Sequence, residues 1–304
     1  MNNISKWLLE GNNMAYAMAG FIGFFIILYF FYNAMSFWIL KERYHGIRFT
    51  TKNIAYITMF TAINVSVTIV ISLTVPITVF PPIRIAFEGV MVKITGFIFG
   101  PIIGVLVALI TEVLVMIFVP SFIHPAFIIV IICYGFIAGI GSSFLRLGKG
   151  YNWVPVLLIN LFLIVFAAFM VFVIDGYPDD ESIAVLSFQV SKEVYKWIFL
   201  ASIIACLALF WVMYLTLLIK GHRKTLHVLL PVILFATASE YLVTAVISAW
   251  GDAGFLGIPS HDGTNGYTAM FISRLVQAPL KIVFNSAVLY FTYKAVSPLI
   301  KRDR

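Results

Sequence analysis

The sequence predicts an all-α polytopic membrane protein, and three observations support this fold class. Of the 304 residues, 62% are hydrophobic and only 11% are charged, whereas soluble globular chains contain about 45–50% apolar and about 25% charged residues. The mean hydropathy is +1.03, and the apolar residues are gathered in long runs. A soluble fold of this size needs more surface charge, and disorder requires low hydrophobicity. Both of these classes are therefore excluded.

Nine apolar segments are long enough to be considered as membrane spans, because a bilayer core about 30 Å thick needs roughly 20 helical residues. They cover residues 14–40, 54–80, 84–100, 101–120, 125–145, 153–174, 197–219, 227–249 and 267–297. The third and fourth are divided at Gly100-Pro101, since glycine permits a tight reversal and proline cannot continue a helix. The first is longer than the core of a signal peptide, and no small-residue cleavage site follows it, so we expect it to be retained.

Basic residues are concentrated in every second connection and in the C-terminal tail. These segments hold twelve of the 20 lysines and arginines, namely Lys41, Arg43, Arg48, Lys52, Arg146, Lys149, Lys220, Arg223, Lys224, Lys301, Arg302 and Arg304. Excess positive charge marks cytoplasmic loops, so the N-terminus is predicted outside and the C-terminus in the cytoplasm. The net charge of +7 is thereby explained by topology, and a nucleic-acid partner is not expected.

A few charged residues are predicted at membrane depth, where each costs roughly 2.5–3.5 kcal/mol unless it faces a protein interior or a wet cavity. They are Glu88, Lys93, Glu112, Glu240, Arg274 and Lys281, with Arg84 at the membrane edge. One interpretation is a set of structural ion pairs, and the other, which we favour, is a polar ligand pocket. The helical spacing of Arg274, Gln277, Lys281 and Asn285 places two cations and two amides on one face. Such a face suits an anion that also carries hydrogen-bonding groups.

Two further features are assigned to the outer side of the membrane. His124 lies at a helix junction, Ile-His-Pro, and is either a ligand contact or an interfacial residue. The segment from Trp250 to Gly266 is rich in glycine and lacks lysine and arginine. We interpret it as a flexible loop that is either a lid over the pocket or a simple connector.

Small residues four positions apart mark one face of the second span. Thr58, Ala62 and Ser66 would let another helix approach closely, either within the chain or from a partner subunit. A second run, Gly96, Gly100 and Gly104, is expected to pack internally.

No enzyme, cofactor or metal site is predicted. The two cysteines, Cys133 and Cys206, lie within apolar runs and form no metal-ligand spacing. The Gly148-Lys149-Gly150 segment lacks the other positions of a phosphate loop, and no catalytic set of side chains is found.

The segment Arg84-Ile-Ala-Phe-Glu88, the turn Phe99-Gly100-Pro101-Ile-Ile-Gly104 and the following Glu112 resemble the substrate-binding S components of energy-coupling factor (ECF) vitamin transporters. The similarity covers about residues 50–145 and 227–297. It is greatest to folate-specific members, through the Arg-Ile-x-Phe opening, Pro125-Ala-Phe and Ser273-Arg274-Leu-Val-Gln277-Ala-Pro.

The resemblance implies a six-helix core plus three additional transmembrane helices in a bacterial plasma membrane protein. Residues 1–49 would form an extra helix and basic loop, 50–146 the first part of the core, 147–226 an inserted helix pair, and 227–304 the end of the core. The partners implied are a transmembrane coupling subunit and two ATP-binding cassette ATPases. Docking on the coupling subunit would use Ala55, Thr58, Ala62 and Ser66, although the alanine pair usual in the family is incomplete here.

The resemblance also implies a folate or related vitamin as ligand, with Arg274 and Lys281 at its carboxylates and Arg84 in reserve. Glu88, Glu112 or Glu240 would bind the pterin edge, with Glu88 favoured, and Gln277, Asn285, His124 and Trp250 complete the expected set. Riboflavin or another vitamin is the first alternative. A self-sufficient secondary transporter is the second, although that class usually contains inverted repeats with broken helices in both halves.

Overall fold

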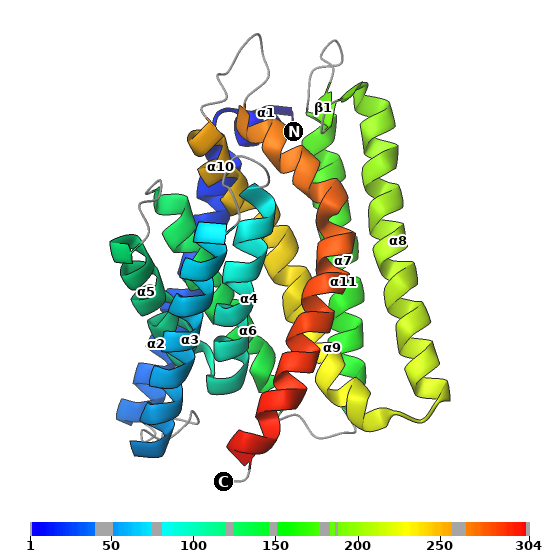
Figure 1. Ribbon diagram of the computed structural model, residues 1–304. Coiled ribbons are helices and arrows are strands. Elements are labelled where there is room, and N and C mark those ends of the chain that lie inside the picture. The colour runs from blue at the N-terminus through cyan, green and yellow to red at the C-terminus, as the bar shows by residue number, and fades with distance from the viewer. Residues whose placement is uncertain are drawn as a thin grey trace. The chain divides into compact units, whose positions relative to one another are not determined.

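The computed structural model describes residues 2–39, 51–74, 81–118, 124–145, 151–176, 183–185, 188–256 and 266–301. In these ranges the chain is built almost entirely of helices. They are α1 (Asn2–Leu9), α2 (Asn13–Ile39), α3 (Thr51–Thr74), α4 (Pro81–Phe99), α5 (Pro101–Phe118), α6 (Pro125–Ser143), α7 (Trp153–Asp175), α8 (Lys192–Ile219), α9 (Arg223–Ala238), η2 (Ser239–Ile247), α10 (Ser248–Leu256) and α11 (Gly266–Lys301). Each of the nine predicted apolar segments contains a helix, which confirms the predicted fold class (Figure 1).

Seven helices in the described ranges are long and apolar enough to cross a membrane. They lie in α2, α5, α6, α7, α8, the continuous run α9–η2–α10, and α11. The apolar parts of α3 and α4 are shorter, at Ile54–Val70 and Gly89–Phe99. Helices are the expected solution because hydrocarbon provides no water to satisfy open backbone groups.

By packing, the chain divides into two compact units. The first contains residues 1–17 and 144–287, and the second contains residues 18–143 and 288–304. Two of the three boundaries fall inside continuous helices, α2 and α11, and the third lies at the end of α6. The predicted division into a core, an inserted pair and an extra N-terminal helix stays a prediction.

In the second unit, the backbones of α4, α5 and α6 come into direct contact, because glycines without side chains face one another where these helices meet. A Cβ at Gly96 or Gly104 would collide with the carbonyl of Gly135, and one at Gly139 would collide with Pro101. The helices turn sharply at Gly100, whose φ of 97° is in the left-handed region that favours glycine. The predicted reversal at Gly100-Pro101 and the predicted internal packing of the glycine run are both confirmed.

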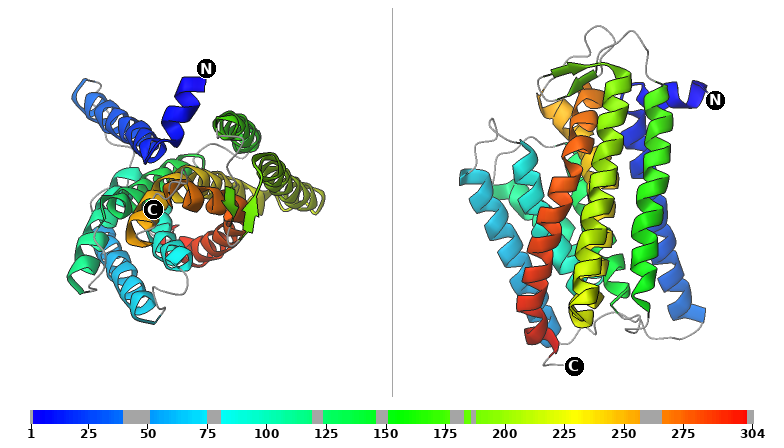
Figure 2. Two further views of the ribbon diagram at one scale, coloured as in Figure 1. Left: turned by 90° about the horizontal axis from the view of Figure 1, so that it is seen from above. Right: turned by 90° about the vertical axis from the view of Figure 1, so that its right-hand side faces the viewer.

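In the first unit, α7 packs against α8 and α9, and α7 and α8 run side by side as long neighbours (Figures 1 and 2). Their connection includes a small antiparallel hairpin, β1 (Ile183–Val185) and β2 (Phe188–Val190), in which Ala184 pairs with Gln189. The sequence analysis did not predict this hairpin. The same end of the helix pair is joined by an ion pair between Lys196 and Asp175, 2.7 Å apart.

The predicted span at 227–249 is not a uniform α-helix. After α9 the backbone widens into a π-helix, η2, before returning to α-helix in α10. The Thr244 hydroxyl donates to the Ser239 carbonyl across five residues, at 3.3 Å. π-Helical segments are rare and are found frequently at functional sites.

Candidate functional site

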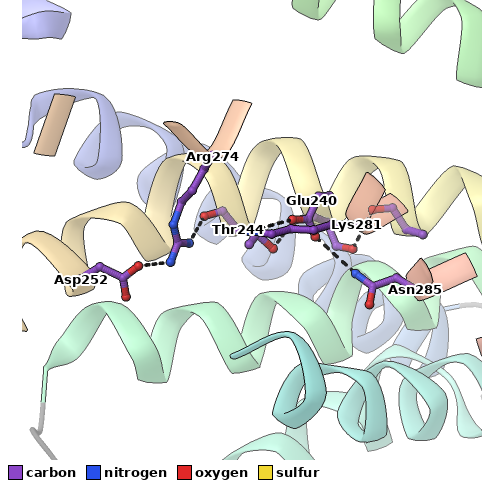
Figure 3. Close-up of polar contacts among 8 residues, drawn as sticks. Glu240, Thr244, Asp252, Arg274, Lys281 and Asn285 are labelled. Atoms are coloured by element: carbon purple, nitrogen blue, oxygen red, sulfur yellow. Dashed lines mark hydrogen bonds and ion pairs between the residues drawn. The ribbon is translucent and has the colours of Figure 1, made fainter. Parts of the chain in front are cut away.

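Three of the four polar residues predicted to share a face of the last helix direct their side chains at the π-helix and α10 within the first unit. Arg274, Lys281 and Asn285 are separated by seven and four residues, which is close to two turns and one turn of α-helix. Their side chains meet acidic or carbonyl groups of η2 and α10 (Figure 3). Arg274 and Asn285 are buried, with 3% and 1% exposure.

At one end of this face, Arg274 is held by two acceptors. One terminal nitrogen donates to the Thr244 carbonyl, and the other donates to Oδ2 of Asp252 in an ion pair. Both charged side chains are only 3% exposed. A hydrogen bond between two charged groups such as these is stronger than one between neutral groups.

Asp252 is a residue that the sequence analysis assigned to the outer loop. The structure corrects this assignment, because Trp250 and Asp252 lie on α10 rather than in an irregular segment. Glycine at 251 and 254 had favoured a loop, yet the helix continues to Leu256. The remaining part of the proposed lid, residues 257–265, lies outside the described residues.

Two turns further along α11, Lys281 and Asn285 meet Glu240 of η2, which is the centre of a second cluster. Its Oε1 lies 4.0 Å from Nζ of Lys281, and its Oε2 accepts a hydrogen bond of 3.3 Å from Nδ2 of Asn285. Among the described residues, Lys281 Nζ and Asn285 Oδ1 are buried atoms with no hydrogen-bond partner. The cluster therefore has one donor group and one acceptor available for a polar ligand.

The two clusters are electrically balanced. Arg274 is opposed by Asp252, and Lys281 is opposed by Glu240. Balance is expected at membrane depth, since an isolated charge there is costly. These four side chains form ion pairs with one another, as the first interpretation of the sequence expects. The second interpretation, a polar ligand pocket, concerns the same side chains and stays a prediction.

Aromatic residues of neighbouring helices support this region of the first unit. The Tyr195 hydroxyl of α8 donates to the Ile272 carbonyl at 3.3 Å, and the Tyr267 hydroxyl donates to the Val246 carbonyl at 3.1 Å. These bonds fix the backbone beside Arg274 and inside η2.

Trp250 and Gln277 lie on the same two helices as this site, and their contact with a ligand stays a prediction. The ring of Trp250 packs edge-on against Tyr16, with centroids 4.8 Å apart. Gln277 is partly buried on α11, between Arg274 and Lys281 in the chain.

The other predicted ligand residues belong to the second unit. Glu112 is partly buried on α5, and Arg84 and Glu88 lie in the first half of α4, where side chains are outside the described part of the structure. Lys93, which the sequence placed at membrane depth, is buried, with Nζ 4.0 Å from the centroid of the Tyr134 ring. The convergence of these residues with Arg274 and Lys281 on one chamber stays a prediction.

His124 has a local structural role at the start of α6. Its Nδ1 accepts a hydrogen bond of 3.2 Å from the backbone N–H of Ala126. Burial lowers the pKa of His124, so the neutral ring that can accept this bond is the form present at pH 7. A contact with ligand is an additional role that stays a prediction.

The small-residue face of α3 is open in the structure. Ala55, Thr58, Ala62 and Ser66 are all exposed, whereas Phe60 and Asn64 are buried on the opposite side of the helix. Asn64 donates a hydrogen bond to Thr95 of α4 at 3.3 Å. The buried side of α3 therefore makes the internal contacts, and the small residues are left accessible.

The chain matches a known family over more than half of its length. The family described as "ECF-type riboflavin transporter, S component" matches residues 48–224, a segment that includes α3 to α8. No curated protein and no solved structure matches the chain.

Proposed function

Because the chain belongs to the family of ECF-type riboflavin transporter S components, we propose that it is the vitamin-binding subunit of an ECF importer and that riboflavin is its ligand. The family match, which covers more than half of the 304 residues, supports the first part. The family description and the charge balance of the polar site support the second.

The observation that carries the choice of ligand is the pairing of each buried cation on α11 with a carboxylate. A folate brings carboxylates that need an unopposed arginine or lysine, and both Arg274 and Lys281 already face an acid. Riboflavin is uncharged and offers carbonyl, imide and hydroxyl groups. The donor at Lys281 Nζ and the acceptor at Asn285 Oδ1 suit a neutral ligand of this kind.

Folate is the second candidate, favoured by a specific sequence feature. The segment Ser273-Arg274-Leu-Val-Gln277 resembles folate-specific S components. In that case Arg84 is the candidate for a cation at the carboxylate end.

The proposed mechanism separates binding from energy supply. The protein would bind its vitamin from the outer side, with the N-terminus outside and the C-terminus cytoplasmic, and would then dock on a transmembrane coupling subunit. The exposed residues Ala55, Thr58, Ala62 and Ser66 would form the docking face, since small side chains allow close helix approach. Two ATP-binding cassette ATPases would supply the energy.

The position of the six-helix core has two alternatives. In the first, α3–α6 and the helices from α9 to α11 form the core, and α7 and α8 are inserted. In the second, which follows from the extent of the family match, α3 to α8 form the core, and the helices after residue 224 are the addition. The placement of the polar site on η2, α10 and α11 favours the first.

Titration of the purified full chain with riboflavin and with folate tests the proposed ligand. We expect riboflavin fluorescence to be quenched in a saturable manner, and folate to compete only weakly. Asn285→Ala is expected to weaken riboflavin binding by roughly tenfold, the value of one hydrogen bond. Saturable folate binding without riboflavin binding would reverse the order of the two candidates. Transport by the chain reconstituted alone would instead identify a secondary transporter.

A further inference from the structure

The strongest anion-binding side chain of the candidate site is occupied by the protein itself. Arg274 donates to Asp252 from one terminal nitrogen and to the Thr244 carbonyl from the other (Figure 3). A guanidinium can otherwise donate from both terminal nitrogens to one carboxylate or phosphate of a ligand. A ligand carboxylate or phosphate that binds both terminal nitrogens would therefore have to displace Asp252.

Displacement of Asp252 would be costly because of where the two residues lie. Asp252 is on α10, Arg274 is on α11, and each side chain is 3% exposed. Separating them would leave a carboxylate without its counter-ion in a desolvated environment. An uncharged ligand imposes no such cost, since the ion pair can persist beside it.

The second cation on this face of α11 gives no alternative anion site. Lys281 lies 4.0 Å from Glu240, so a carboxylate or phosphate brought to Lys281 would also be placed near Glu240. The charge of both clusters is thus balanced before any ligand binds.

We propose that Asp252 determines the charge of the ligand that the site accepts. Because Asp252 already pairs with Arg274, the site selects an uncharged vitamin over phosphorylated or carboxylated analogues. Removal of the Asp252 carboxylate would create an anion site at Arg274. The proposal rests on the proposed function, because it assumes that a vitamin binds beside these residues.

The experiment compares three probes, riboflavin, riboflavin 5′-phosphate and folate, on the purified full chain. The wild-type protein is expected to prefer riboflavin to its 5′-phosphate by roughly tenfold or more. In Asp252→Asn this preference should shift toward the phosphate by roughly tenfold or more, the value of one charge-assisted hydrogen bond. The double variant Asp252→Asn/Arg274→Gln should lose that gain.

Asp175→Asn is the matched control. Asp175 belongs to the same unit and forms an ion pair of 2.7 Å with Lys196, but it is half-exposed and distant in the chain from the site. Its removal is expected to leave the ratio of the two affinities unchanged.

Stability provides a second measurement, because Asp252→Asn leaves a buried guanidinium without its counter-ion. If the variant does not fold alone, recovery of folded protein with riboflavin 5′-phosphate but not with riboflavin supports the proposal. Recovery with neither riboflavin 5′-phosphate nor folate overturns it. An unchanged affinity ratio in folded Asp252→Asn, or equal wild-type affinity for riboflavin and its phosphate, overturns it as well. Wild-type protein that binds no vitamin overturns the proposed function, and the proposal with it, which is a distinct result from an unchanged ratio.

Discussion

Among single residues, Lys281 and Glu240 provide the clearest separation of structural and ligand-binding roles. The two charged atoms are 4.0 Å apart, at the limit of an ion pair, and Lys281 Nζ makes no hydrogen bond in the described part of the chain. Lys281→Met should leave Glu240, which is 3% exposed, as an uncompensated buried acid. We expect a loss of about 3–5 kcal/mol of stability and a clear loss of vitamin affinity.

The double variant Lys281→Met/Glu240→Gln distinguishes the two roles. It removes both charges, so most of the stability should return, while affinity should stay low because the ligand has lost its donor. Thermal unfolding in detergent and vitamin titration measure these two quantities. Lys196→Met is the control, since a partly exposed pair such as Lys196 and Asp175 contributes about 0–1 kcal/mol. Recovery of full affinity in the double variant would assign the pair a purely structural role.

The sequence could predict which residues of α11 share a face, because helical spacing alone decides it. It could not predict what that face meets. Asp252 was interpreted as a loop residue because Gly251 and Gly254 surround it, and only the continuation of α10 through these glycines buries it against Arg274. Pairing between helices depends on three-dimensional position, which local periodicity does not contain.

At the scale of elements, the close packing of α4, α5 and α6 depends on glycine. A Cβ at Gly135 would collide with the backbone of Gly104 and Val105, and backbone atoms cannot move aside as a flexible side chain can. Gly135→Ala should therefore cost about 1–3 kcal/mol or more through overpacking. Thermal unfolding and the recovery of monodisperse protein measure this loss.

Gly20→Ala is the control for this prediction. Gly20 also lies in a predicted membrane span, on α2, but a Cβ there would meet nothing within 4 Å. Alanine at this position should be neutral or should stabilise the protein by about 0.5–1 kcal/mol, because glycine is unfavourable within a helix. Equal stability of Gly135→Ala and Gly20→Ala would contradict the packing account.

The helices themselves could be predicted from hydropathy, since a membrane span needs a long apolar run. The wide turns of η2 could not be predicted in this way. The segment Ser239–Ile247 is mostly apolar, like an ordinary membrane span, and its composition does not indicate which backbone hydrogen bonds it makes. The hairpin of β1 and β2 was missed because its strands are only three residues each, too short to show an alternating pattern.

At the scale of the whole molecule, an S component must perform two separable tasks, binding a vitamin and docking on a coupling subunit. The residues assigned to these tasks lie on different helices, with the polar face on α11 and the small-residue face on α3. A change on one helix should therefore affect one task only. Ala62 is exposed, so a larger side chain there fits without disturbing the interior of the protein.

Ala62→Leu is accordingly expected to leave vitamin affinity unchanged while it abolishes uptake in cells and co-purification with the coupling subunit and ATPases. The added side chain would prevent the close helix approach that small residues permit. Ala168→Leu is the matched control, because Ala168 is also exposed on a membrane-spanning helix, α7, but is not part of the small-residue face. Uptake that survives Ala62→Leu would place the docking face elsewhere. Loss of vitamin binding in the same variant would instead show that α3 contributes to the ligand site, and that the two tasks are not separate.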